Sequence, residues 1–158
     1  MSGFHASAVV YGELGILIRG ASGAGKSRLA ANLVEIAAER GIYSALIGDD
    51  RLHLEILNER LIARGARAVH GLIETRGYGL RRLGAVGHAR IDIAIDLLAS
   101  RETVARMPAE DENHADILGH VLPRIAFAPT LAGRELAYRA TALISDLMTL
   151  PAKNANFA

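Results

Sequence analysis

The sequence predicts an α/β fold with a mixed, largely β core, one helix behind a glycine-rich phosphate loop and one helix near the C-terminus. Three observations lead to this prediction. A phosphate-loop pattern stands between an apolar run and an amphipathic run, in the order of a strand and a helix. Short apolar runs bounded by turn residues outnumber helical patterns. Strands and helices do not alternate regularly, so the pattern does not favour a doubly wound sheet.

The first expected elements surround the phosphate loop. Apolar runs at 5–11 and 14–18 predict two strands joined by a short Gly-Glu turn. The spacing of apolar residues predicts a helix over 27–40, which Gly41 ends. A short apolar strand is expected at 44–47, directly before a Gly-Asp-Asp sequence.

The middle of the chain predicts mainly strands. Segments 53–56 and 60–63 flank a Leu-Asn-Glu turn, which is typical of a hairpin. Segment 69–75 predicts another strand, and the glycine-rich stretch 77–87 is expected to break it.

The last third of the chain predicts two strands and a helix around a polar loop. Alternating apolar residues predict a strand at 90–98, and the polar stretch 100–116 predicts a mobile loop. A strand is expected at 121–127, where Pro123 favours an edge position. Helical periodicity predicts a helix over 135–147.

Composition limits the class of protein. With 158 residues, 51% of them hydrophobic, the chain has the usual length of one domain, expected over residues 1–150 with a frayed tail at 151–158. A net charge of +1 predicts neither nucleic acid nor a membrane surface as a partner. The absence of cysteine excludes disulfides and thiolate metal sites. No signal peptide or membrane-length apolar run is present, so the sequence predicts a cytoplasmic protein.

The phosphate loop is the strongest motif. Residues Gly20-Ala21-Ser22-Gly23-Ala24-Gly25-Lys26-Ser27 match G-x-x-x-x-G-K-[ST] at each fixed position. Its glycines let backbone N–H groups point at phosphate oxygens, and the helix start adds positive charge there. Lys26 would reach the β- and γ-phosphates, and Ser27 would ligate Mg²⁺. The alternative is a glycine-rich turn without a ligand.

Carboxylates and cations elsewhere could supply chemistry to this loop. Asp49 and Asp50 end a strand, where one could face a metal and the other an acceptor hydroxyl, although Gly-Asp-Asp also suits a plain turn. Glu74 and Arg76 share one face of a strand, as a metal-linked carboxylate beside a cation or as a surface ion pair. For His5, an ordinary surface or core histidine is the commoner role.

The order of these motifs resembles the catalytic domain of bacterial HPr kinase/phosphorylase. The resemblance runs from His5 to about Ile144, and no single motif after the phosphate loop decides it. The matching motifs in chain order are His5, the phosphate loop, Asp49-Asp50-Arg51, the stretch from His70 through Glu74, Arg76, Gly77 and Gly79, Arg106-Met107, and Gly133-Arg134-Glu135-Leu136-Ala137.

The resemblance implies a phosphate-loop kinase fold of the phosphoenolpyruvate-carboxykinase type, assembled as a homohexamer. It implies a kinase that uses ATP and Mg²⁺ to phosphorylate a serine of HPr, the phosphocarrier of the sugar phosphotransferase system. Many members also remove that phosphate with inorganic phosphate and release pyrophosphate. The resemblance covers the catalytic domain, so a short form without a separate N-terminal domain is expected.

The resemblance also assigns roles to residues. Asp49 would be the base that takes the serine proton and the acid in the reverse direction, and Lys26 would neutralise the phosphates. Ser27, Asp50 and Glu74 would hold or orient the metal, Arg106 would close onto the phosphates, and His5 would tune the aspartates. Arg76 and Gly77 belong to the most characteristic stretch of the family. Leu80-Arg81-Arg82 departs from its apolar continuation, a region implicated in dephosphorylation, so the kinase direction carries over more directly.

Two other functions fit a phosphate loop. A small-molecule kinase would need an enclosed acceptor pocket, whereas a protein kinase needs an open one. A nucleotide-sensing module would bind ATP without transferring phosphate. Three carboxylates near one phosphate site favour chemistry over sensing, because closely spaced carboxylates repel one another unless a cation or proton joins them.

Overall fold

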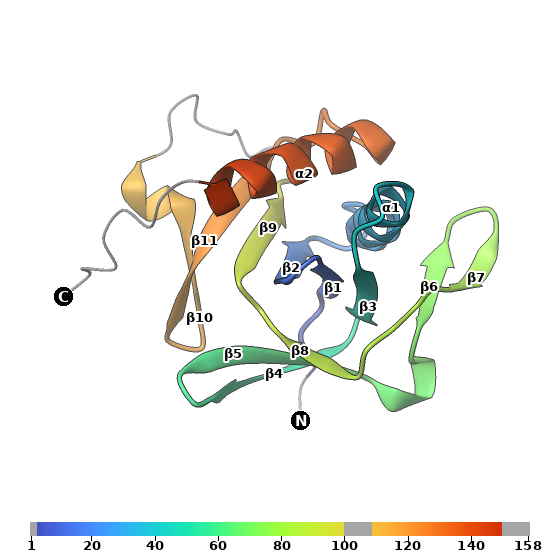
Figure 1. Cartoon of the computed structure of the whole chain (residues 1–158), viewed down its shortest axis with the longest axis horizontal. Helices are drawn as coiled ribbons and strands as arrows, with labels where there is room; N and C mark the ends of the chain where they lie inside the picture. Colours follow the sequence, from blue (N-terminus) through green and yellow to red (C-terminus); the bar gives the residue numbers. More distant parts are fainter. Residues whose placement is uncertain (1–2, 100–108, 150–158) are drawn as a thin grey trace.

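The structure is a computed structural model that describes residues 3–99 and 109–149 (Figure 1). Its main element is a six-stranded sheet, accompanied by a three-stranded sheet and a two-stranded hairpin. Across the large sheet the strands are β10 (His114–Ile117), β11 (His120–Phe127), β9 (Ile93–Leu97), β2 (Leu14–Gly20), β1 (Ser7–Tyr11) and β3 (Ser44–Gly48). The other elements are the small sheet β4 (Leu52–Leu57), β5 (Arg60–Gly65) and β8 (His88–Arg90), the hairpin β6 (Leu72–Thr75) and β7 (Gly79–Arg82), the helices α1 (Lys26–Glu39) and α2 (Gly133–Thr149), and the short 3₁₀ turns η1 (Arg67–Val69) and η2 (Glu110–Asn113).

The six-stranded sheet is covered on both faces. On one face, Ile16 and Ile18 of β2 join a core with residues of both helices, including Leu33. On the other face, Leu17 joins a second core with the small sheet, including Leu61. A strand that is buried on both sides needs apolar residues at every position, which explains the unbroken apolar run in β2.

Strand directions bring two functional segments to one edge of the sheet. β2 runs parallel to β9, whereas β1 is antiparallel to both β2 and β3. β2 and β3 therefore point the same way, and the segments that follow them leave from the same edge. Those segments are the phosphate loop after β2 and Asp49-Asp50 after β3.

The structure corrects four details of the expected elements. The glycine-rich stretch 77–87 contains β7, and the expected strand 90–98 begins only at Ile93. The polar stretch is not all loop, since 110–117 form η2 and β10, while 100–108 lie outside the described residues. The expected edge position of 121–127 is wrong, because β11 lies between β10 and β9. Pro123 is tolerated there because pairing with β9 begins only at Arg124.

Neither helix of the described chain is long and apolar enough to cross a membrane. The expected tail at 151–158 lies outside the described residues.

A charged cluster ties together three strands beside the phosphate loop. Asp96 of β9 accepts hydrogen bonds from Arg19 of β2 at 2.7 and 2.8 Å and from Arg124 of β11 at 2.5 Å. Burial by itself raises the pKa of the Asp96 carboxyl, but the hydrogen bonds and charges of the two arginines outweigh it and leave that pKa lowered. Folding therefore favours the ionised carboxylate.

Replacing Asp96 by asparagine should lower the free energy of unfolding by about 2 kcal/mol at neutral pH, because two arginines lose their common counter-charge. The stabilisation from the lowered pKa is present above the ordinary value of 3.8 and is lost as the pH falls through the folded pKa below it. Urea unfolding between neutral and acidic pH measures both effects. Asp146→Asn, at an exposed position of α2, is the control; a pH-independent difference between Asp96→Asn and the wild type would contradict the expectation.

Candidate active site

The phosphate loop leads directly into the N-terminus of α1. Gly23 and Gly25 have φ angles of 80° and 100°, a left-handed conformation that glycine adopts without strain. Gly25 is also the N-cap of α1, so no side chain caps the free N–H groups of the first turn. That turn contains no acidic residue. The helix start is therefore a site suited to an anion, as the sequence predicts.

Lys26 lies folded over the loop. Its Nζ donates hydrogen bonds of 3.0 Å to the carbonyl oxygens of Gly20 and Ala21. The ammonium group is thus held at the mouth of the loop, where it can exchange these carbonyls for phosphate oxygens.

Asp49 is the carboxylate that the structure brings to the loop. The Oγ of Ser27 lies 2.9 Å from both carboxylate oxygens of Asp49, and the Oγ of Ser7 donates to Asp49 Oδ1 at 2.5 Å. A hydroxyl and a carboxylate in contact form a pair of hard oxygen donors, which is the chemistry that Mg²⁺ prefers. Mg²⁺ typically takes only one or two carboxylates and fills its shell with phosphate oxygens and water. The residues present therefore fit a Mg²⁺ ion that accompanies a nucleotide.

Asp50 points elsewhere. It has a φ of 66°, and its Oδ1 lies 3.4 Å from Nδ1 of His5. Both side chains are about three-quarters exposed, at 72% and 75%. The structure thus brings His5 to the aspartate pair, but next to Asp50, on the solvent side of the site.

The remaining expected residues are farther from the Ser27–Asp49 pair. Glu74 of β6 is exposed, and no described hydrogen bond or ion pair joins it to that pair. Arg76 and Gly77 lie at the exposed tip of the β6–β7 hairpin, and Arg106 lies outside the described residues. Among described residues, no group of three or more histidine or acidic side chains is placed to hold a metal. Metal roles for Asp50 and Glu74 stay predictions.

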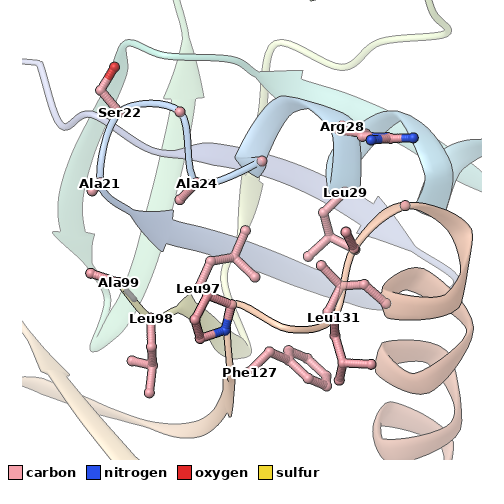
Figure 2. A pocket seen from close by; sticks show the side chains of 16 residues that line it. Ala21, Ser22, Ala24, Arg28, Leu29, Leu97, Leu98, Ala99, Phe127 and Leu131 are labelled. Carbon is pink, nitrogen blue, oxygen red and sulfur yellow. The ribbon is translucent and has the colours of Figure 1, made fainter. Parts of the chain in front are cut away.

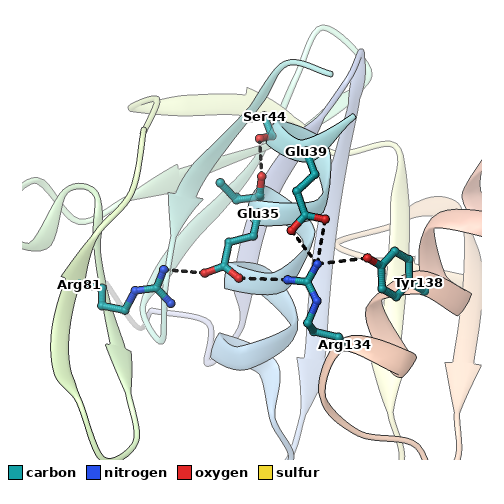
Figure 3. A network of polar contacts seen from close by, with 7 residues as sticks. Glu35, Glu39, Ser44, Arg81, Arg134 and Tyr138 are labelled. Atoms are coloured by element: carbon teal, nitrogen blue, oxygen red, sulfur yellow. Dashed lines mark hydrogen bonds and ion pairs between the residues drawn. The ribbon is translucent and has the colours of Figure 1, made fainter. Parts of the chain in front are cut away.

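The β6–β7 hairpin is anchored to both helices by a polar network (Figure 3). Glu35 of α1 forms two ion pairs. Its Oε1 lies 2.5 Å from a guanidinium nitrogen of Arg81 of β7, and its Oε2 lies 3.5 Å from one of Arg134 of α2. Arg134 also donates to Glu39 at 2.7 and 2.9 Å and to the Tyr138 hydroxyl at 3.1 Å. A two-stranded hairpin is marginal by itself, so these contacts and the buried Ile73 hold it on the body.

A cavity of about 470 Å³ opens beside the phosphate loop, and neither Ser27 nor Asp49 lines it (Figure 2). Leu97, Phe127 and Leu131 form its apolar wall, and Ala21 and Ala24 of the loop face them. The volume lies within the range usual for small-molecule sites.

Sequence reasoning did not identify this wall or Ser7. The wall residues come from the ends of β9 and β11 and from the segment before α2, which only the parallel pairing brings together. For Ser7 a signal did exist, because it is a polar residue within the apolar strand Ser7–Tyr11.

Comparison with known proteins agrees with this geometry. Residues 2–152 match the model of the family described as "HPr Serine kinase C-terminal domain". The chain belongs to this family. The HPr kinase/phosphorylase of Levilactobacillus brevis is 34% identical over 142 residues, which cover 81% of this chain and 42% of that protein. The HPr kinase/phosphorylase of Caldicellulosiruptor bescii is 34% identical over 138 residues, with the same two coverages.

The HPr kinase fold is also found among solved structures. The structure of the Hpr(Ser) kinase/phosphatase from Coxiella burnetii superposes with a TM-score of 0.75 at 25% sequence identity, covering 94% of this chain and 91% of that one. The expected α/β fold with a largely β core and two helices is confirmed. The chain spans about two fifths of the length of the curated HPr kinase relatives that it matches.

Proposed function

We propose that the chain is an ATP- and Mg²⁺-dependent protein-serine kinase that phosphorylates HPr and also removes the phosphate by phosphorolysis. The observation that carries this proposal is the contact between Asp49 and Ser27. It sets a carboxylate beside the hydroxyl that ends the phosphate loop. A loop that only sensed nucleotide would not need a carboxylate of this kind at the γ-phosphate end.

In this proposal, each residue of the site has a separate role in the reaction. Backbone N–H groups of the loop and the Lys26 ammonium hold the phosphates, and Ser27 with Asp49 would hold Mg²⁺, which would neutralise charge on the phosphate oxygens. Asp49 accepts the proton of the acceptor serine as its Oγ bonds to the γ-phosphorus, and the bond from that phosphorus to the β–γ bridging oxygen breaks to release ADP. As the resemblance implies, Asp50 and Glu74 would complete the surroundings of the metal, and Arg106 would act on the phosphates.

The direction of approach favours a protein acceptor over a small molecule. Beyond Asp49, the site opens through Asp50 and His5, whose side chains are mostly exposed. An enclosed acceptor pocket would bury these groups. The contact between His5 and Asp50 supports a role for His5 at the aspartate pair, as the resemblance implies. The cavity beside the loop, lined by Leu97, Phe127 and Leu131, suits the nucleoside end of ATP, because this wall is apolar.

The wider setting follows the family. We propose a cytoplasmic homohexamer with HPr as partner and with neither nucleic acid nor membrane bound. Light scattering of the purified chain tests the hexamer.

Incubation with HPr, ATP and Mg²⁺, followed by mass spectrometry, tests the function. Phosphoserine on HPr is the expected result, and its loss on addition of inorganic phosphate, with pyrophosphate formed, is expected for the reverse direction. ATP binding without any phosphoserine would instead favour a sensor. ATP turnover that ignores HPr but responds to a small alcohol would favour a small-molecule kinase.

A further inference from the structure

The Asp49 carboxylate lies between two serine hydroxyls of different character. Ser27 belongs to the phosphate loop and lies 2.9 Å from both carboxylate oxygens. Ser7 belongs to β1, is 0% exposed and donates to Oδ1 alone. A buried hydroxyl needs a hydrogen-bond partner, and the described partner of Ser7 is this carboxylate. Ser7 thus makes the two oxygens unequal, since Oδ2 accepts only from Ser27 among the described residues.

A β-bulge sets up this contact. β1 and β3 pair regularly up to Val9 opposite Leu46, but the next pair is Ala8 opposite Gly48, so Ile47 is an extra residue on β3. Continued from there, the register sets Ser7 beside Asp49. Without the extra residue, Ser7 would stand opposite Gly48. Bulges near active sites commonly re-aim a side chain in this way.

The packing on each side of the sheet agrees with this shift. Leu46 faces the helices, so simple alternation would send Gly48 to the helix side and Asp49 to the small sheet. A Cβ on Gly48 would instead meet Leu52 and Gly65 of the small sheet, at 2.6 and 2.9 Å. Asp49 therefore turns to the helix side, where Ser7 and Ser27 lie.

We infer that Ser7 is a positioning residue for phosphoryl transfer: its hydroxyl holds Oδ1 of Asp49 and thereby fixes the orientation of the carboxylate toward the metal and the acceptor. The inference rests on the proposed function. Ser7 touches neither nucleotide nor acceptor and acts only through Asp49. Its hydroxyl stays available to Asp49 when the Ser27 hydroxyl is engaged at the phosphates, so the carboxylate keeps one orientation through the reaction.

The experiment compares Ser7→Ala with Ser44→Ala. Both remove one hydroxyl from a strand of the same sheet, and the Ser44 hydroxyl bonds only the Val34 carbonyl, at 3.2 Å, among described contacts. We measure kcat and KM for phosphorylation of HPr, and by calorimetry ATP affinity with and without Mg²⁺. For Ser7→Ala we expect kcat to fall about 10- to 100-fold, with the KM for ATP little changed, because a misplaced catalytic group costs rate more than binding.

Further readouts separate positioning from folding. Ser7→Thr keeps the hydroxyl and should retain most of the wild-type kcat. The thiol of Ser7→Cys is a weaker donor, so the kcat of this variant should lie between those of the wild type and Ser7→Ala. Ser7→Ala should also lose part of the gain in ATP affinity that Mg²⁺ gives the wild type, while metal-free ATP binding stays unchanged. A thermal melt of each variant checks that it is folded.

Equal kcat and equal Mg²⁺ dependence in Ser7→Ala and Ser44→Ala would overturn the inference, as would a loss of rate that merely follows the melting temperature. If instead the proposed function is wrong, the experiment gives a different result. In that case the wild type itself leaves HPr unphosphorylated, and the effect of Mg²⁺ on ATP affinity still decides the role of Ser7.

Discussion

Replacing Asp49 by asparagine should lower kcat for HPr phosphorylation about 1000-fold, the usual contribution of a positioned general base. Asparagine keeps the size of the side chain and an acceptor oxygen for Ser7, but it cannot accept a proton at neutral pH. The phosphate loop is untouched, so ATP should still bind without metal, while part of the gain in affinity from Mg²⁺ should be lost. Steady-state kinetics with HPr and calorimetry with ATP measure the two effects separately.

The matched control is Asp116→Asn on β10. This exposed carboxylate accepts a hydrogen bond of 2.8 Å from the Gly119 N–H, at the opposite edge of the sheet from β3. It should leave both kcat and ATP affinity unchanged. Normal transfer by Asp49→Asn would remove Asp49 as the base. A larger loss of kcat in Asp50→Asn than in Asp49→Asn would exchange the proposed roles of the two aspartates.

The parts of the site that the sequence predicts are those determined by local chemistry. The phosphate loop is fixed by glycines at set positions, and α1 follows from apolar spacing directly after it. The hairpin between 53–56 and 60–63 follows from a turn in which Asn58 and Glu59 have φ angles of 49° and 61°. Asparagine tolerates this conformation well, so a local signal was present.

The parts that the sequence does not predict depend on contacts between distant strands. An extra residue in β3 reverses which of two adjacent aspartates faces the loop, and no single-strand pattern shows where such a residue lies. β10 is polar along its exposed side, so only its pairing with β11 makes it a strand. The placement of Glu74 depends on how the β6–β7 hairpin docks on α1, through Arg81 and Glu35.

Substitution of Gly65 by alanine should be a strongly damaging small change beside the site. Gly65 ends β5 and packs against the bulged end of β3, where a Cβ would lie 2.0 Å from the Ile47 carbonyl oxygen and 3.3 Å from Cα of Gly48. These neighbours are backbone atoms of paired strands, so they cannot rotate aside. We expect the free energy of unfolding to fall by about 3 kcal/mol or more, at the upper end of the cost of overpacking. Urea unfolding measures it.

Gly87→Ala is the control, since a Cβ there would meet no heavy atom within 4 Å and the φ of Gly87 is not left-handed. It should leave stability nearly unchanged. Because the strain in Gly65→Ala falls on the end of β3 that carries Asp49, kcat should fall further than the folded fraction does. If Gly65→Ala were as stable as Gly87→Ala, this would show that β5 can move away from β3. Full kcat in the folded fraction would show that Asp49 keeps its place without that contact.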